Sequence, residues 1–167
     1  MKHTAYFLIL FCLAFISATM AKTPPEFIVG KWISNKGDFI VEVYKTGNKY
    51  HAKLVWFDDT DTDLHTETAT DYNNPDSELR TRKLIGMEVL ENLTYNTNSN
   101  KYEEGTIYDA TTGKKWTAFA FLNEQKLLVV KAYWKFKFLS QTLVLKRYYL
   151  NQNQLSTNNR VNPVKKY

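Results

Sequence analysis

The chain has 167 residues, a formal net charge of +5, an aromatic content of 15% and a single cysteine. This length suits one domain of ordinary size with a core of its own. The basic residues are scattered among acidic ones instead of forming a patch or stripe, so the sequence does not favour nucleic-acid binding.

The first segment has the pattern of a secretory signal peptide. Lys2 is followed by an uncharged apolar run over residues 5–15 and by small residues up to Ala21, the order of regions that such a signal requires. We predict a signal peptide over residues 1–21, cleavage after Ala21 and a periplasmic or secreted protein. The run is shorter than the roughly 20 residues that cross a bilayer, so no stable membrane anchor is expected after cleavage. Loss of Cys12 leaves a domain without internal disulfides.

The following segments alternate apolar and polar residues with a period of two, which predicts β-strands. The expected strands span residues 38–44, 50–56, 84–95, 101–108, 115–122, 127–133, 134–138 and 142–149. Many short strands with tight turns favour an all-β fold, an antiparallel up-and-down barrel of about eight strands, because closure removes exposed sheet edges. We expect the barrel domain over residues 22–150 and a flexible polar tail over residues 151–167.

Two local features complete this interpretation. The alternation in the second strand places one set of side chains on the same face, namely Tyr50, Ala52, Leu54 and Trp56. Besides a short turn or helix near the N-terminus of the domain, one short helix is expected over residues 75–82, with Asn74 as its N-cap and Pro75 at its first position.

Gly30 and Trp32 lie just before the first predicted strand, and Arg147 lies in the last. This arrangement resembles the calycin group of barrels, which includes lipocalins and fatty-acid-binding proteins. The resemblance implies that Trp32 crosses the bottom of the barrel and that Arg147 packs on its indole ring, a favourable cation–π contact.

A string of polar motifs resembles, more closely, an exported bacterial family known as domain of unknown function 2147. The motifs are Asp71-Tyr72-Asn73-Asn74-Pro75-Asp76, Leu79-Arg80-Thr81-Arg82, Ile85-Gly86, Glu104-Gly105-Thr106-Ile107-Tyr108-Asp109 and Thr112-Gly113-Lys114. The chain departs from the family pattern at Ala110, where proline is usual, and at Lys131-Ala132-Tyr133 and Ser140-Gln141, where glycines are usual. The resemblance implies a barrel and an envelope location, and it supplies no established activity.

No catalytic or metal-binding motif is present. The chain contains neither a zinc-ligand spacing nor a nucleophile elbow. Asp59, Asp61 and Asp63 alternate as in a calcium loop, but the glycine and the bidentate glutamate of that loop are replaced by Leu64 and Thr70. We therefore expect no cofactor, no metal and no catalytic residue with a visible signature.

One polar cluster is the main candidate site. Its members are Asp71, Asn73, Asn74, Asp76, Arg80 and Arg82. Turn chemistry explains each of these side chains without a ligand. Alternatively, the cluster lies at the mouth of the barrel and orients a small ligand, with Trp56 and Tyr108 lining the entrance or simply filling the core.

The sequence favours an exported protein that binds a small, partly apolar ligand. Two alternatives remain open: an envelope enzyme acting through Asp71, Arg80 or Glu104, and a structural or protein-interaction domain. An internal cavity favours binding, a cleft with converging acids and arginines favours catalysis, and a filled barrel with an exposed apolar patch favours interaction. The partner proteins are not indicated by the sequence.

Overall fold

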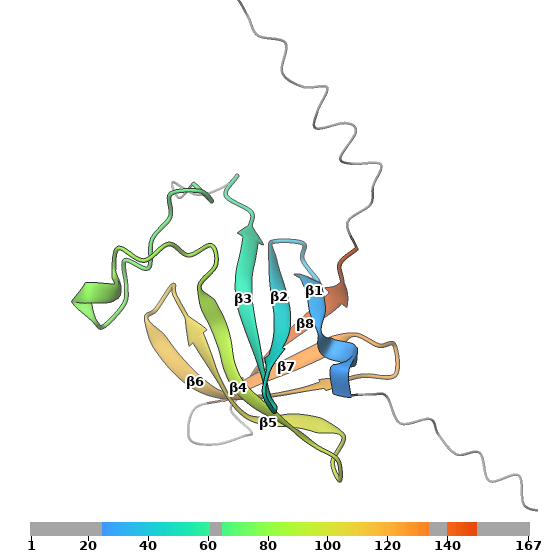
Figure 1. The fold of residues 1–167 in the computed structure, drawn as a ribbon. Coiled ribbons are helices and arrows are strands. Elements are labelled where there is room, and N and C mark those ends of the chain that lie inside the picture. Colours follow the sequence, from blue (N-terminus) through green and yellow to red (C-terminus); the bar gives the residue numbers. More distant parts are fainter. Residues whose placement is uncertain (1–24, 61–64, 134–139, 150–167) are drawn as a thin grey trace, which may run out of the picture.

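The computed structural model describes residues 25–60, 65–133 and 140–149, and these form an eight-stranded barrel (Figure 1). A 3-10 helix, η2, precedes the strands, and a second one, η3, interrupts the connection between β3 and β4. The elements are η2 (Pro25–Ile28), β1 (Gly30–Ser34), β2 (Phe39–Thr46), β3 (Lys49–Phe57), η3 (Ser77–Leu79), β4 (Glu88–Asn96), β5 (Lys101–Asp109), β6 (Lys114–Leu122), β7 (Leu128–Tyr133) and β8 (Ser140–Arg147).

Each strand pairs antiparallel with the next, and β8 returns to pair with β1. The closing pairs include Trp32 opposite Arg147 and Ser34 opposite Leu145. The prediction of an all-β, antiparallel up-and-down barrel of about eight strands is therefore confirmed. Closure leaves no strand of the sheet without two neighbours.

Buried aromatic and aliphatic side chains fill one end of the barrel, which we call the closed end. Trp32 is fully buried and donates from Nε1 to the carbonyl oxygen of Ile28 at 2.7 Å. Tyr50 and Tyr102 meet edge to face with ring centroids 5.1 Å apart, and the Tyr102 hydroxyl donates to the carbonyl oxygen of Pro25 at 2.6 Å. Helix η2 thus lies across this end, and these two side-chain hydrogen bonds help to hold it there.

The strand predictions need two corrections. Gly30–Ser34, placed before the first strand, is itself β1 and supplies the pairing that closes the barrel. The predicted strand over residues 84–95 begins only at Glu88, because residues 84–87 form a turn in which Gly86 has φ +87° and its N–H bonds back to Leu54. The predicted strand over residues 134–138 lies outside the described residues.

The helix predicted over residues 75–82 is wrong in extent and in its cap. Only Ser77–Leu79 is helical, and the Asp76 side chain caps it by accepting from the N–H of Glu78. The Asn74 oxygen accepts from the N–H of Asp76 at 2.9 Å, in the turn before η3, while its Nδ2 donates to Asp71 at 2.6 Å. The N–H of Asp71 bonds to the carbonyl oxygen of Arg82 at 2.9 Å, so the chain turns back there and cannot continue as a helix.

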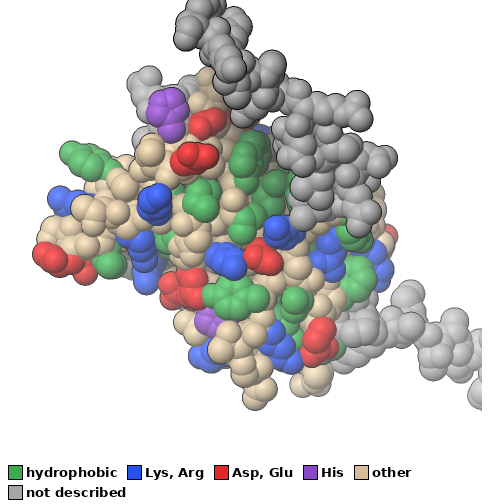
Figure 2. Space-filling view, turned by 45° about the horizontal axis from the view of Figure 1, so that its top comes forward, with side chains coloured by type: hydrophobic (Ala, Val, Ile, Leu, Met, Phe, Trp, Pro, Cys, Tyr) green, Lys and Arg blue, Asp and Glu red, His purple; other side chains and the backbone are tan. Residues whose placement is uncertain are grey.

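The surface is chemically mixed. Figure 2 shows hydrophobic side chains interspersed with charges of both signs on one face of the molecule. Within the described ranges, no helix is long and apolar enough to cross a membrane. The predicted signal peptide over residues 1–21 and the predicted tail over residues 151–167 lie outside the part of the chain that the structure describes.

Candidate binding site

A cavity of about 370 Å³ lies inside the barrel, toward the end opposite Trp32. It reaches the surface beside the exposed side chains of Gln141 and Leu143. Its apolar lining comes from strands β2 to β8 and consists of Phe39, Val41, Val43, Ala52, Leu54, Val89, Leu90, Ile107, Trp116, Leu128, Val130, Ala132, Leu143 and Leu145. This end, which we call the open end, carries the β3–β4 and β5–β6 connections (Figure 1).

Among the described residues, few polar groups border this cavity. They belong to Tyr108, Asp109 and Gln141. The Asp109 carboxylate accepts from the N–H of Thr111 at 3.0 Å and from the hydroxyl of Thr112 at 2.7 Å, so it organises the β5–β6 turn. An apolar space with a small number of polar groups at its rim is the usual composition of a small-molecule site.

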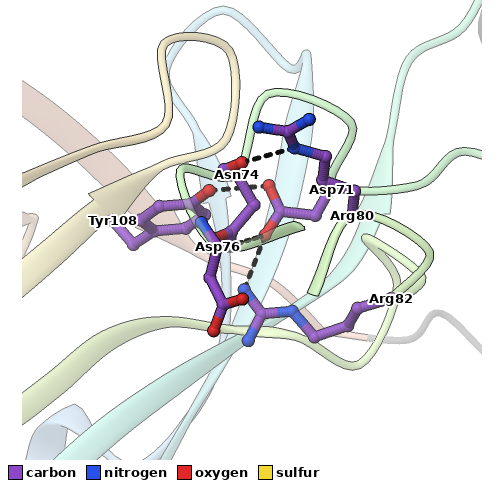
Figure 3. A network of polar contacts seen from close by, with 6 residues as sticks. All are labelled: Asp71, Asn74, Asp76, Arg80, Arg82 and Tyr108. Atoms are coloured by element: carbon purple, nitrogen blue, oxygen red, sulfur yellow. Dashed lines mark hydrogen bonds and ion pairs between the residues drawn. The ribbon is translucent and has the colours of Figure 1, made fainter. Parts of the chain in front are cut away.

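The Asp71 network, which consists of Asp71, Asn74, Arg82 and Tyr108, joins the β3–β4 loop to β5 (Figure 3). The Asp71 carboxylate is fully buried and accepts three hydrogen bonds: from Asn74 Nδ2 at 2.6 Å, from Arg82 Nη2 at 2.6 Å and from the Tyr108 hydroxyl at 2.7 Å. The guanidinium of Arg82 also lies 5.8 Å from the centre of the Tyr108 ring. Three of the roughly four acceptor positions of a carboxylate are thus occupied, and burial keeps Asp71 from direct contact with a ligand in solution.

These contacts perturb the pKa of both central groups. Burial alone raises the pKa of Asp71, but the hydrogen bonds from Asn74, Tyr108 and Arg82, with the Arg82 charge, outweigh it and lower the pKa below its ordinary value. Burial, together with the hydrogen bond to the Asp71 carboxylate and its charge, raises the pKa of Tyr108 to about 12. At neutral pH, Asp71 is therefore an anion and Tyr108 a neutral donor.

The same loop is fixed to the β5–β6 turn by a close backbone approach. Asn73 donates from Nδ2 to the carbonyl oxygen of Thr111 at 2.9 Å. Gly113 has φ +67°, and a Cβ atom on it would lie 2.1 Å from the carbonyl oxygen of Asn73. Only glycine satisfies both the left-handed conformation and this proximity. The motifs around Asp71, Tyr108 and Gly113, far apart in sequence, therefore form one structural unit.

The structure brings together most of the predicted site residues. Asp71, Asn74, Arg82 and Tyr108 share the network, while Arg80 donates from Nε to the carbonyl oxygen of Asn74 at 2.8 Å. Of all the predicted residues, Tyr108 alone borders the cavity. Its neighbour Ile107 faces inward in the pairs with Leu90 and Trp116, so strand alternation directs the Tyr108 ring outward beneath the loop.

The structure places Trp56 away from these residues. A β-bulge sets Val41 opposite Leu54 and Ile40 opposite Trp56, so one extra residue enters β3 between the two pairs. The expected alternation from Tyr50 to Trp56 therefore breaks after Leu54. Trp56 is 38% exposed and does not border the cavity.

The alternative catalytic set does not converge either. Glu104 has φ +64° in an irregular part of β5 and is exposed. It lies four positions from Tyr108, roughly 13 Å at about 3.3 Å per residue. No hydrogen bond or ion pair between described residues links Glu104 to Asp71 or Arg80.

The signature at the closed end forms as the resemblance implies. Arg147 lies 4.3 Å from the centre of the Trp32 ring system. Its Nη1 donates to the carbonyl oxygen of Val29 at 2.7 Å, and its Nη2 donates to that of Phe27. Gly30 has φ +120°, and a Cβ there would lie 2.9 Å from the guanidinium. Gly30 thus makes room for the arginine that covers the tryptophan.

The structure gives no cation site in its described part. Asp59 accepts from the N–H of Thr66 at 2.7 Å, while Asp61 and Asp63 lie outside the described residues. Among residues 25–60, 65–133 and 140–149, no group of three or more potential ligands could hold a metal ion.

Sequence reasoning missed the residues that border the cavity on β6 and β8. Trp116 and Leu143 are examples, and each lies on an alternating strand whose inward face was already visible. What the sequence could not show is that their inward side chains leave a space instead of filling it, because this depends on the width of the whole barrel.

Comparison with known proteins agrees with the fold. A family model described as "Uncharacterized protein conserved in bacteria (DUF2147)" matches residues 30–147. Among solved structures, the fold is similar to that of protein HP1028 from Helicobacter pylori, described as belonging to the lipocalin family. The TM-score is 0.61 at 20% identity, and the match covers 79% of this chain and 88% of that chain. No curated protein matches this chain.

Proposed function

Since this chain belongs to the bacterial family of uncharacterized proteins DUF2147 and forms a lipocalin-like barrel, we propose that it binds a small, mainly apolar ligand inside that barrel. The cavity of about 370 Å³ carries this proposal. Small-molecule sites typically enclose ~300–1,000 Å³, so this one belongs at the lower end of the range.

The composition of the cavity restricts the ligand. The lining that the described residues provide is aliphatic and aromatic apart from Tyr108, Asp109 and Gln141. At about 30 Å³ per non-hydrogen atom, as in liquid water, the volume accommodates roughly a dozen such atoms. A single unbranched chain or one small ring system fits this description, whereas a two-chain lipid is too large. Burial of such a ligand contributes about 25 cal/mol per Å² of apolar surface before the cost of immobilising it.

Export is part of the same proposal. The charged, apolar and small-residue segments that end at Ala21 support cleavage and delivery to the periplasm or the medium. The test is N-terminal sequencing of the protein recovered from the envelope fraction of a cell that expresses the full chain. Lys22 is expected as the first residue, and an intact Met1 on the recovered protein would contradict export by cleavage.

Ligand binding is tested by native mass spectrometry of the protein purified from its own envelope. We expect a retained apolar compound of about a dozen non-hydrogen atoms. The variant Ala132→Phe fills the cavity and should lose this compound, whereas Ala110→Phe, in the β5–β6 turn, should keep it. An empty wild-type protein that also shows no thermal stabilisation by single-chain alcohols, amines or acids would refute the proposal.

A catalytic role has less support. It requires an acid or base that can exchange protons with a substrate, yet Asp71 is buried under three donors and its lowered pKa keeps it ionised. The geometry is that of a carboxylate that holds a loop in place.

A further inference from the structure

A second hollow, which we call the outer groove, lies between the β3–β4 loop and the outer face of β4 to β6. Its volume is about 430 Å³. Residues of the loop and of the three strands border it, among them Pro75, Leu79, Arg82, Glu91, Tyr108 and Lys115. Several of the family-like motifs therefore meet at this groove, and one of their residues, Tyr108, borders both the groove and the barrel cavity.

The Asp71 network accounts for only part of this lining. Arg82 and Tyr108 are bound to Asp71, and Glu88 accepts from the Tyr44 hydroxyl. The side chains of Glu91 and Lys115, in contrast, form no hydrogen bond and no ion pair within the described part of the chain. The groove is thus bordered by one carboxylate and one ammonium group that have no hydrogen-bond or ion-pair partner among the described residues.

The sheet register sets the distance between these two charges. Glu91 on β4 pairs with Thr106 on β5, which pairs with Thr117 on β6. Lys115 lies two positions before Thr117. With strands about 4.8 Å apart and a rise of about 3.3 Å per residue, the Cα atoms of Glu91 and Lys115 are roughly 12 Å apart. Both side chains border the groove, so a ligand between them meets opposite charges at its two ends.

The wall between the two charges is partly apolar. Pro75 and Leu79 come from the loop, and Leu79 is 38% exposed, so it is accessible to a ligand in the groove. The Tyr108 ring, directed outward beneath the loop, adds an aromatic surface. A ligand with an apolar middle, a positive group at one end and a negative group at the other matches this order of groups.

We infer that the outer groove binds a short zwitterionic peptide of dipeptide size, with its ammonium group at Glu91, its carboxylate at Lys115 and its side chains against Leu79 and Pro75. The volume accommodates roughly fourteen non-hydrogen atoms at about 30 Å³ each, which is the size of alanyl-leucine. This site is separate from the barrel cavity and does not depend on the ligand proposed there.

The test is a titration of the isotope-labelled full chain with alanyl-leucine, followed by amide chemical shifts. We expect shifts at Leu79, Glu91 and Lys115, and none at Leu128 inside the barrel. The uncharged probe N-acetyl-alanyl-leucine amide should cause no such shifts. Glu91→Gln and Lys115→Met should each weaken binding about tenfold or more, the usual effect of losing a charged hydrogen-bond partner.

Two matched variants serve as controls. Lys114→Met removes the same charge from the neighbouring position, and Glu124→Gln removes an acidic group in the β6–β7 turn; neither residue borders the groove. Both should bind alanyl-leucine as the wild type does. Equal binding of the blocked probe, equal losses in the controls, or an absence of shifts with the free dipeptide would each overturn the inference.

Discussion

Replacement of Asp71 by asparagine separates the charge of the buried carboxylate from its shape. Oδ2 accepts from Asn74 and Arg82, and Oδ1 accepts from the Tyr108 hydroxyl. An asparagine oxygen at the Oδ2 position keeps the first two bonds, and the tyrosine hydroxyl can rotate to accept from the new amide. The variant therefore loses the charge assistance of these bonds, and the Tyr108 hydroxyl proton loses its carboxylate acceptor.

The expected loss follows from this geometry. Hydrogen bonds to charged groups contribute about 1.5–3 kcal/mol each and neutral ones about 1 kcal/mol. Because the Arg82 side chain is 38% exposed, solvent screens its ion pair with Asp71 and reduces what that pair contributes to the free energy of unfolding. We expect Asp71→Asn to lower the free energy of unfolding by about 2 kcal/mol. Asp71→Ala leaves all three donors unpaired and should cost about 3–5 kcal/mol.

Urea denaturation of both variants measures these losses, with Asp76→Asn as the control. Asp76 is exposed and caps η3, and asparagine caps equally well, so its change should stay within about 0.5 kcal/mol. The pKa of Asp71 is lowered in the folded state. Its stabilisation is therefore present above the unfolded value of about 3.9 and disappears as the pH falls through the lower folded pKa. Equal losses at positions 71 and 76, or a difference unchanged at low pH, would refute the reasoning.

Three further predictions concern single side chains. Gly113→Ala should cost about 2–4 kcal/mol in denaturation, whereas Gly47→Ala, at φ +58° with nothing within 4 Å, should cost about 1 kcal/mol; similar losses would contradict the close approach. Arg147→Met should lower the melting temperature by several degrees and shift Trp32 fluorescence, measured by thermal and emission scans; unchanged emission would argue against the stacking. Ultraviolet titration should show tyrosines that ionise near pH 12, among them Tyr44 and Tyr108, and Tyr108→Phe should remove one of them. The stabilisation from the raised pKa of Tyr108 is present below about pH 10 and is lost as the pH rises through about 12.

The sequence predicted the barrel because inward and outward residues alternate along nearly every strand. The prediction failed where one strand depends on its partner. Leu54, Val55 and Trp56 are all apolar, so nothing in their order marks the bulge that turns Trp56 outward. Likewise, β1 is only five residues long, and its status as a strand rests on pairs with β2 and β8 that its own sequence does not reveal.

The sequence predicted which residues belong to the candidate site better than it predicted what each of them does. Asp71, Asn74 and Arg82 are close in sequence, and turn chemistry already explained them. Tyr108 is 37 positions from Asp71, and only the folded chain shows that its hydroxyl completes the network. Local propensity also favoured Asn74 as the helix cap, but its oxygen accepts from the N–H of Asp76, before the helix begins, and the Asp76 side chain caps η3 instead.

Both ends of the barrel are held by polar contacts that a glycine makes possible. At the closed end Gly30 admits Arg147 over Trp32, and at the open end Gly113 admits the loop that carries Asp71. The cavity between these two ends has almost no polar group to orient a ligand, because the charged side chains near it serve the loop and the turn. A ligand in the proposed site would therefore be selected by its size and shape. One methylene group more or less changes the free energy of binding in an apolar pocket by only about 1–3 kcal/mol. Within the described part of the chain, charged side chains without a partner border the outer groove, namely Glu91 and Lys115.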